Sequence, residues 1–356
     1  MKIKNLFEHK FERKRLQELD NCQDCNRLGK QGIFSQYCSN HSNIKNYRNF
    51  QEGKDIPYAD EAKVQWQQQY STHFNLLDKN FYQEFPTGFL SRCWELKVFD
   101  FLHEHQHKGI ELKELKGKQS KPDGCFTLAG KFFYPECICV NPWEKLPYQI
   151  KEHNGRLYQV GSWPSVLLNS RFKEKVSQAL KEKTEKYTKG YEAYIMKHGE
   201  GGLILFISIP SPSFDAGPID YISAILSCLL PTSEIQQFPI IVGKNNQLIM
   251  GKPYYECQKS YAKSSNNASI ENYYFDNKDF NHISAVIVST SPHVFFPNID
   301  KYEAINWGRI RNDFLLFHNP QAKYPLPKGF FVVQKEIEIA KSSDKKHYRV
   351  TIFDYK

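Results

Sequence analysis

Apolar residues recur with helical spacing in three segments of the chain. Over residues 89–102 they return every fourth position, as on a helix that packs along one side. A second stripe predicts a long helix over about residues 171–189, and residues 219–230 are apolar enough for a buried helix. We therefore expect three helices that each bury an apolar face.

Short apolar runs predict the strands of a sheet. Several are continuous rather than alternating, which is typical of strands buried on both faces. The predicted strands cover residues 121–128, 131–140, 203–209, 238–242 and 283–289, with a late hairpin or edge from 330–333 and 348–353. Because such strands need cover on each face, we expect an α/β fold: a mixed sheet with helices on both faces.

The domain organisation follows from a change in composition near the start. Residues 43–75 are polar and have no steady apolar period. A chain of 356 residues is long enough for one large domain with a small appendage. We expect an N-terminal segment at 1–50, a polar linker at 51–80 and an α/β domain at 81–356.

Cysteine and histidine residues near the start have the spacing of a zinc site. Cys22, Cys25, Cys38 and His41 form a C-x2-C-x12-C-x2-H pattern. Two short-spaced pairs joined by a loop can supply the four tetrahedral ligands of a structural Zn²⁺. We expect a small zinc knuckle here; the alternatives are incidental surface thiols or a redox Cys-x-x-Cys pair.

The chain is basic, with a net charge of +9 from 48 Lys and Arg against 39 Asp and Glu. Basic surfaces recruit polyanions through counterion release, so this charge favours a nucleic-acid partner. Residues 1–15 contain no apolar block of the kind found in secretory signals, and the longest apolar runs fall short of the about 18 residues that span a bilayer. We expect a cytoplasmic protein with no membrane span, and the oligomeric state stays open.

Two carboxylates flank a predicted two-residue turn at Ala129 and Gly130. Counting outward from the turn pairs Asp123 with Glu136. Opposed residues of an antiparallel pair have Cβ atoms about 4.5–5.5 Å apart, close enough for two carboxylates to share one Mg²⁺ or Mn²⁺. A bulge at Pro135, which lacks a backbone donor, is an alternative register, and each acidic residue taken alone is also an ordinary turn or surface residue.

The order of these residues resembles the PD-(D/E)XK nuclease superfamily, in which a helix supplies a Glu ahead of a Pro-Asp and a Glu-x-Lys strand. Glu95, Asp123 and Glu136 match the acidic positions, and the resemblance covers about residues 89–209. It implies a three-layer, restriction-endonuclease-like core with elements in the order α-β-β-β-α-β, in which a short strand near residues 110–115 is counted. It also implies that the acidic residues are catalytic and hold a divalent metal ion.

The chain departs from that pattern at Ile138, where the family has a lysine that orients water and stabilises the transition state. In some members of the superfamily the lysine comes from the following helix. Lys183, expected on a polar helix face, is therefore the first candidate for this role, and Lys121 is the second.

Basic residues are concentrated on the helix predicted over residues 171–189. Arg171, Lys173, Lys175 and Lys181 could contact successive phosphates and so position a nucleic acid without reading its bases. The alternative is a solvated helix face on which glutamates three or four residues away neutralise the lysines.

Together these patterns predict metal-dependent hydrolysis of nucleic-acid phosphodiesters, with DNA favoured over RNA. The motifs G-x4-G-K-[ST], G-x-G-x-x-G, G-x-S-x-G and H-E-x-x-H are absent from the sequence. Two alternatives stay open: a non-catalytic nucleic-acid-binding module on a degenerate nuclease fold, and a zinc-stabilised protein-interaction factor.

Overall fold

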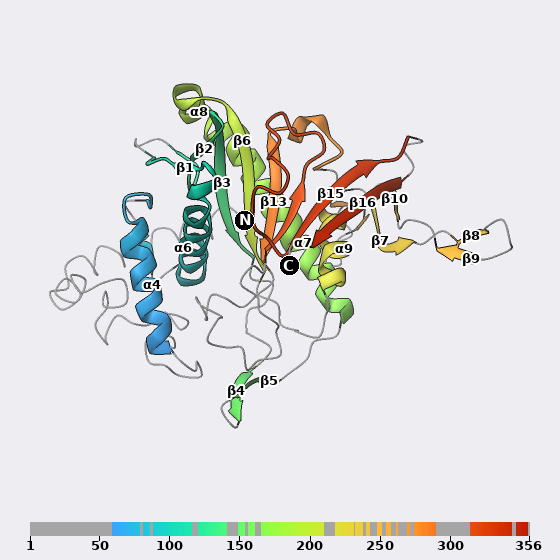
Figure 1. Ribbon diagram of the computed structural model, residues 1–356, viewed down its shortest axis with the longest axis horizontal. Coiled ribbons are helices and arrows are strands. Elements are labelled where there is room, and N and C mark those ends of the chain that lie inside the picture. Colours follow the sequence, from blue (N-terminus) through green and yellow to red (C-terminus); the bar gives the residue numbers. More distant parts are fainter. Residues whose placement is uncertain are drawn as a thin grey trace, which may run out of the picture.

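A mixed sheet of ten strands forms the centre of the structure, which is a computed structural model (Figure 1). In spatial order its strands are β1 (Glu111–Leu112), β2 (Phe126–Leu128), β3 (Lys131–Cys139), β6 (Gly201–Ser208), β13 (Ile283–Ser289), β14 (Phe314–His318), β15 (Lys335–Lys341), β16 (His347–Asp354), β10 (Tyr254–Cys257) and β7 (Thr232–Gln237). Strands β3, β6 and β13 run parallel, as do β14 and β15, and the other neighbours are antiparallel. The predicted α/β class with a mixed sheet is confirmed.

The structure describes residues 59–78, 81–85, 88–115, 120–140, 149–153, 156–160, 165–209, 218–230, 232–237, 240–242, 248–250, 254–257, 261–262, 269–270, 274–289, 314–343 and 347–354. The helices are α4 (Ala59–His73), α5 (Phe81–Glu84), α6 (Phe89–Glu104), α7 (Ser165–Glu185), α8 (Glu192–His198) and α9 (Pro218–Leu229), with a π-helical turn at Lys186–Gly190 and 3₁₀ turns at Gln106–Lys108 and Lys278–Phe280. Three two-stranded sheets join β4 (Gln149–His153) to β5 (Arg156–Val160), β8 (Ile240–Val242) to β9 (Leu248–Met250), and β11 (Tyr261–Ala262) to β12 (Ser269–Ile270).

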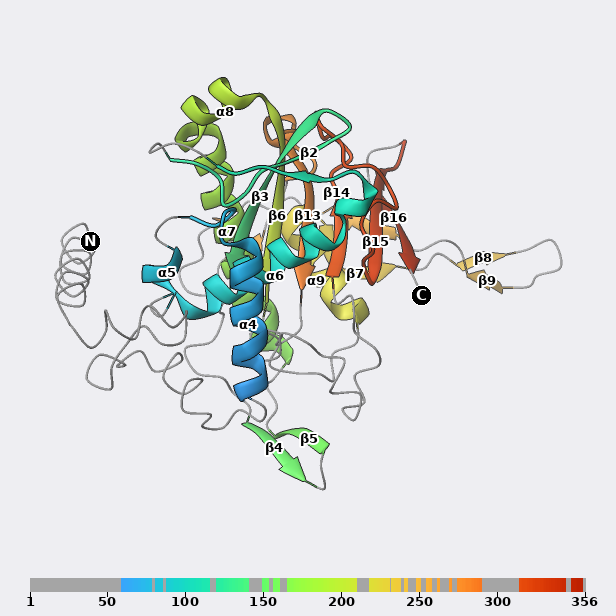
Figure 2. The same ribbon diagram turned by 60° about the vertical axis from the view of Figure 1, so that its left-hand side comes forward.

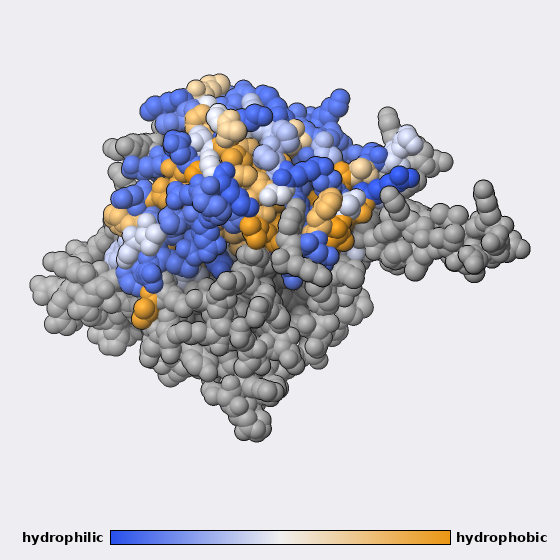
Figure 3. Space-filling model, in the orientation of Figure 1, coloured by the Kyte–Doolittle hydropathy of each residue, from blue (hydrophilic) through white to orange (hydrophobic). Residues whose placement is uncertain are grey.

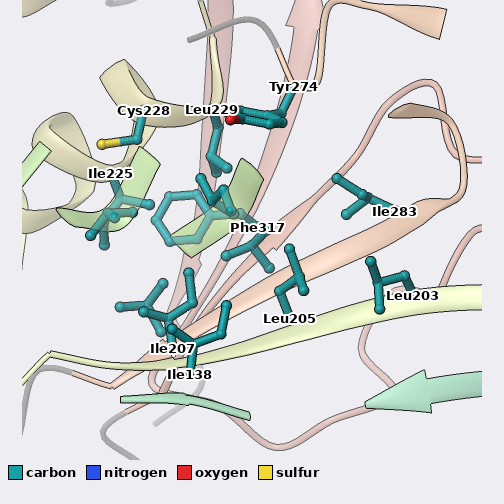
Figure 4. Packing of buried hydrophobic residues seen from close by; sticks show 14 of the residues in the cluster. Ile138, Leu203, Leu205, Ile207, Ile225, Cys228, Leu229, Tyr274, Ile283 and Phe317 are labelled. Atoms are coloured by element: carbon teal, nitrogen blue, oxygen red, sulfur yellow. The ribbon is translucent and has the colours of Figure 1, made fainter. Parts of the chain in front are cut away.

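Strand β6 is buried along its whole length, and its alternate side chains enter two hydrophobic clusters. Leu203 and Leu205 pack with residues of α7 and α9 in the larger one, called here the α7 cluster (Figure 4). Ile204 and Phe206 pack with Trp94 of α6 in the other, called the α6 cluster. The indole N–H of Trp94 also donates to the carbonyl oxygen of Phe206 at 2.9 Å, which fixes α6 on this strand.

Helix α4 occupies part of the segment predicted as a polar linker. It lies against α6 (Figure 2), and its Trp66 is fully buried. Asp100 of α6 accepts a hydrogen bond from Gln69 Nε2 at 3.0 Å and lies 3.4 Å from Nε2 of His73. Helix α4 is polar, so its sequence shows no apolar period that would predict a helix. Its packing against α6 therefore stabilises the helical structure. The boundaries at residues 50 and 80 stay a prediction.

The late hairpin forms from β15 and β16, so the strand predicted at residues 330–333 is wrong. Ile337 and Ile339 of β15 enter the α7 cluster. Glutamates alternate with them in the sequence, so this segment has no continuous apolar run from which a strand would be predicted. One of these, Glu336, is almost fully buried. Hydrogen bonds from the backbone N–H of Gly329 and with His318 Nε2 satisfy its carboxylate there. Of the strand predicted at residues 238–242, the structure describes residues 240–242, which form β8 in the separate β8–β9 sheet.

The surface of the described residues is mixed in character. Hydrophilic residues make up much of it in the view of Figure 1, with apolar residues between them (Figure 3). Among the described helices, none combines the length and apolar character that crossing a bilayer requires.

Candidate active site

The β2–β3 turn and the strand pairs next to it form as the sequence predicted, but β2 begins at Phe126, so the strand predicted over residues 121–125 is wrong. Leu128 pairs with Lys131 across a two-residue turn, and the ladder continues to Phe126 and Phe133. Ala129 and Gly130 in the turn have φ of 49° and 75°. Positive φ at both central residues is what a type I′ turn requires, and its twist suits an antiparallel pair.

Beyond these pairs the ladder stops, because Pro135 has no N–H to donate. The N–H of Gly124 still donates to the Pro135 carbonyl at 3.2 Å, and a Cβ at Gly124 would lie 2.8 Å from Pro135 Cγ. The N–H of Asp123 donates to Glu136 Oε1 at 3.3 Å, and the N–H of Cys137 donates to Asp123 Oδ2 at 2.7 Å. The two carboxylates therefore lie side by side, held by side-chain to backbone bonds instead of a ladder pair.

Lys183 reaches both carboxylates from α7. Its Nζ donates to Glu136 Oε2 and lies 3.4 Å from Asp123 Oδ2. Ile138, two residues after Glu136, points to the same side of β3 and packs in the α7 cluster (Figure 4). An apolar residue at that position thus contributes to the core, while the helix that borders the same cluster supplies the cation.

The local placement of Lys183 differs from the expectation of a polar helix face. Leu180 and Tyr187 on either side of it are buried, and the Lys183 side chain itself is only 22% exposed. Lys121, the second candidate, donates its Nζ to the carbonyl oxygen of Leu115 at 2.8 Å. Of the two candidates, the structure places Lys183 at the acidic pair.

Glu95 approaches the pair from α6. It is 4% exposed, and Arg92 Nη1 donates to its Oε2 at 2.6 Å, while Nη2 of the same guanidinium binds Glu84. The charge of Asp123 contributes to a raised pKa of Glu95, after burial as the larger cause. Of the four residues that the sequence selected as catalytic, Asp123, Glu136 and Lys183 are in direct contact, and Glu95 lies near enough to Asp123 for their charges to interact.

Burial and mutual repulsion favour the protonated forms of two of these carboxyls. Burial and the nearby Asp123 raise the pKa of Glu95 to about 8 and that of Glu136 to about 7. Burial opposes the charge of Lys183, but Asp123 and Glu136 outweigh it and raise the pKa of Lys183 well above its usual range. Lys183 thus stays cationic at neutral pH, where the glutamates can exchange protons.

Tyr191 is a site residue that sequence reasoning missed. Its hydroxyl donates to Glu136 Oε1 at 2.5 Å, and it directly follows the π-helical turn Lys186–Gly190. The ammonium of Lys186 lies 5.1 Å from the centroid of the Tyr191 ring, and its charge lowers the pKa of Glu136. A π turn breaks the 3.6-residue period from which a helix is recognised, so no pattern pointed to Tyr191.

The oxygen donors of this cluster fit a hard divalent cation. Within the described ranges, no group of three or more His, Cys, Asp or Glu side chains is arranged to hold a metal ion. Mg²⁺ does not require three protein side chains, because one or two carboxylates together with substrate phosphates commonly hold it. Among the described residues, Arg92 pairs with Glu84 and Glu95, and Lys183 pairs with Asp123 and Glu136. Asp123 and Glu136 are the residues that would hold such an ion.

Two of the residues predicted to bind nucleic acid, Lys175 and Lys181, do not lie on one face of α7. Lys175 and Lys181 are both exposed; Arg171 and Lys173 lie on the same helix, but their side chains are outside the described set. At about 100° per residue, Lys181 points roughly 160° away from Lys183, whereas Lys175 lies roughly 80° from it. Glu182, next to Lys181, accepts a hydrogen bond from Gln178 at 2.8 Å. Nucleic-acid binding by these lysines stays a prediction.

The predicted zinc ligands Cys22, Cys25, Cys38 and His41 lie outside the described residues, and the zinc knuckle stays a prediction. No family model, no curated protein and no solved structure matches this chain. The function has to be inferred from the chemistry of the residues themselves.

Proposed function

We propose that this protein hydrolyses phosphodiesters of nucleic acid, DNA in preference to RNA, with Mg²⁺ or Mn²⁺ held by Asp123 and Glu136. The observation that carries the proposal is the convergence of Glu95, Asp123, Glu136 and Lys183, which come from four different segments of the chain. Isolated surface charges would have no reason to meet at one buried place, because burying carboxylates is unfavourable unless they are paired or coordinated.

The element order supports a restriction-endonuclease-like core with helices on both faces of the sheet. Helix α6 is followed by β1, β2 and β3, then by α7 and by β6, which pairs parallel to β3. This is the α-β-β-β-α-β order that the resemblance implies, with β4 and β5 inserted before α7 and with the π turn and α8 inserted before β6. The division of β6 side chains between the α6 and α7 clusters agrees with three layers.

Each residue has a role that its contacts support. When bound, the divalent ion supplies Lewis-acid chemistry that polarises a phosphodiester and lowers the pKa of water. The ammonium of Lys183 stabilises negative charge that develops on the phosphate, and its pairing with both carboxylates keeps it oriented. Glu95, anchored by Arg92, completes the acidic group from the α6 side.

A second candidate is a non-catalytic nucleic-acid-binding module. The observation that favours it is the bridging position of Lys183, whose ammonium already neutralises the pair where a metal ion would do so. In that case the residues form a structural ion-pair network, and cationic residues such as Lys175 provide the affinity. For both candidate functions, the zinc knuckle would stabilise the N-terminal segment.

Cleavage assays separate the two candidates. We expect wild-type protein to cut plasmid DNA, and to cut structured RNA less well, in Mg²⁺ or Mn²⁺ but not in EDTA. Asp123→Asn and Lys183→Met should each reduce the rate by at least about 100-fold while the proteins stay folded. Lys323→Met, which removes an exposed ammonium paired with the exposed Glu200, is the matched control and should cut like the wild type.

The two outcomes differ clearly. Metal-dependent cutting that both variants lose supports hydrolysis. Salt-sensitive DNA binding without cutting on either substrate supports the binding module and refutes the enzymatic proposal.

A further inference from the structure

Lys186 is a second cation beside the acidic pair, and it is exposed. It lies three residues after Lys183 and begins the π-helical turn. Its ammonium is near enough to Glu136 for the two charges to interact. Lys183 already pairs with Asp123 and Glu136, whereas no ion pair of Lys186 occurs among the described residues. The first ammonium therefore serves the protein itself, and the second is placed to meet a ligand.

The side chain of Lys186 is held by its neighbours although it is exposed. Its ammonium lies 5.1 Å from the centroid of the Tyr191 ring, as in a cation–π contact. Its stem passes Gly190, where an added Cβ would lie 3.4 Å from Lys186 Cγ. A lysine that binds a ligand loses rotamer freedom, and contacts of this kind reduce that cost. The ammonium is therefore preorganised at this place.

The π-helical turn brings the Tyr191 ring to this ammonium. The N–H of Tyr191 donates to the Lys186 carbonyl at 3.0 Å, which closes the turn between residues five apart. In a regular α-helix, residues five apart point about 140° away from each other. A π turn takes more residues per turn, so the two side chains lie on the same side. Because the Tyr191 hydroxyl donates to Glu136 Oε1 at 2.5 Å, the same ring connects the ammonium to the acidic pair.

The turn borders the side of the acidic pair that solvent reaches. The Asp123 side chain is 25% exposed, whereas Glu136 is fully buried. Ser120, three residues before Asp123, is exposed, and a Cβ added at Gly190 would lie 3.9 Å from its Oγ. A phosphate that approaches Asp123 from solvent would therefore come close to the exposed ammonium of Lys186.

We propose that Lys186 binds a backbone phosphate of DNA next to the phosphate that is cleaved, and so holds the substrate on the acidic pair. This inference rests on the proposed function and adds to it a residue that provides affinity. Neighbouring carboxylates repel a polyanion, so a site built on them needs a cation that is not already paired with them. A contact that is equally strong in the bound substrate and in the transition state lowers KM and leaves kcat unchanged.

The first experiment measures the binding of labelled duplex DNA to the full-length protein by fluorescence anisotropy. It is done in Ca²⁺, which carboxylates also bind, at salt concentrations between about 50 and 200 mM. A cation that neutralises one phosphate contributes about 0.9 to the slope of log Kd against log salt, and about fivefold to tenfold in affinity at about 0.1 M salt. Lys186→Met should therefore lower the slope by about 0.9 and raise Kd about fivefold to tenfold. Lys186→Arg keeps a cation that stacks on an aromatic ring and should bind like the wild type.

Lys189→Met is the matched control. Lys189 is exposed in the same turn, but among the described residues it makes no contact with Tyr191 or with the acidic pair. Loss of its charge should leave Kd and the salt slope close to those of the wild type. Equal weakening in both variants would indicate a general attraction by the basic turn. That result, or an unchanged Kd and slope in Lys186→Met, overturns the proposal.

Cleavage kinetics in Mn²⁺ separate this inference from the proposed function. In Lys186→Met we expect KM to rise about fivefold to tenfold and kcat to change by less than about twofold. If Asp123→Asn stops cutting while Lys186→Met cuts with the wild-type KM, the proposed function holds and this inference is wrong. If the wild type binds DNA without cutting it, the enzymatic proposal fails, while the salt slope still decides whether Lys186 contacts a phosphate. A wild type that binds no DNA refutes both.

Discussion

Replacing Glu136 by glutamine tests the electrostatics of the site without any assumption about catalysis. Glu136 is fully buried in the sheet, and burial raises its pKa to about 7, from 4.5 for an ordinary glutamate. In the unfolded chain the same carboxyl ionises at its ordinary pH. Between these two values the folded protein holds a proton that the unfolded chain has released. The free energy of unfolding must therefore fall as the pH rises through this window.

The size of the effect follows from the two pKa values. A separation of about 2.5 pH units, at about 1.4 kcal/mol each, gives about 3 to 4 kcal/mol of stability that is present below pH 4.5 and lost by pH 8; most of it, about 3 kcal/mol, is lost between pH 5 and pH 8. Glutamine keeps the shape but cannot ionise. The stability of Glu136→Gln relative to the wild type should therefore rise by about 3 kcal/mol between pH 5 and pH 8, whatever constant difference the amide introduces.

Urea unfolding at pH 5, 6, 7 and 8 measures this difference directly. Glu338→Gln is the control, because Glu338 lies on strand β15 and pairs at the surface with Lys328 at 2.7 Å. We expect its pH dependence to match that of the wild type. A stability difference between Glu136→Gln and the wild type that stays constant from pH 5 to pH 8 would refute the reasoning, because Glu136 would then be ionised in the folded protein at all these pH values.

Three further predictions concern other parts of the chain. Burial lowers the pKa of His282 to about 4, and its ring stacks on Tyr187 at 5.1 Å; in Glu136→Gln, where the opposite pH dependence of Glu136 is removed, the stability should fall by about 3 kcal/mol as the pH falls from 6.5 to 4, and Glu136→Gln/His282→Phe should lack this loss in urea titrations. Ala129 has a φ of 49° in the β2–β3 turn, so Ala129→Asn should raise the melting temperature through about 0.5–1 kcal/mol, whereas Ala129→Val should lower it. Elemental analysis should find one Zn²⁺ per chain, and Cys22→Ser or Cys38→Ser should lose it, while an equal zinc content in these variants would exclude the C-x2-C-x12-C-x2-H site.

Much of the site was predictable because its residues lie at fixed offsets from strong local signals. The Ala129-Gly130 turn fixed the hairpin, and counting outward from it placed Asp123 near Glu136. The strand pairing does not continue as far as Asp123 and Glu136, because Pro135 has no N–H to donate. Only one backbone bond remains there, from the Gly124 N–H to the Pro135 carbonyl oxygen. The proximity was therefore correct, but the bonds that produce it were not those of a regular strand pair.

Lys183 lies at the acidic pair, but not for the reason that selected it from the sequence. The sequence suggested a polar helix face, yet Lys183 lies in the buried stripe between Leu180 and Tyr187. A lysine within an apolar period is more informative than one outside it, because burial requires a partner of opposite charge. Glu136, embedded in an apolar strand, is that partner. Tyr191 had no such signal, since its position depends on the π turn.

An ionisable residue at position 136 is unfavourable for the stability of the fold but useful for a functional site. Replacing a buried ion pair by packed apolar residues is often neutral or stabilising, so Glu136 and Lys183 are a weak choice for holding β3 against α7. The neighbouring Ile138 shows that this side of β3 can be filled by an apolar residue. Yet the chain places here a carboxyl with a pKa of about 7 and surrounds it with Lys183, Tyr191 and the N–H of Asp123. Ionisable groups whose pKa is shifted by burial and by a like charge are typical of functional sites. The unfavourable electrostatics of Glu136 therefore favour an active role for this cluster over a purely structural one.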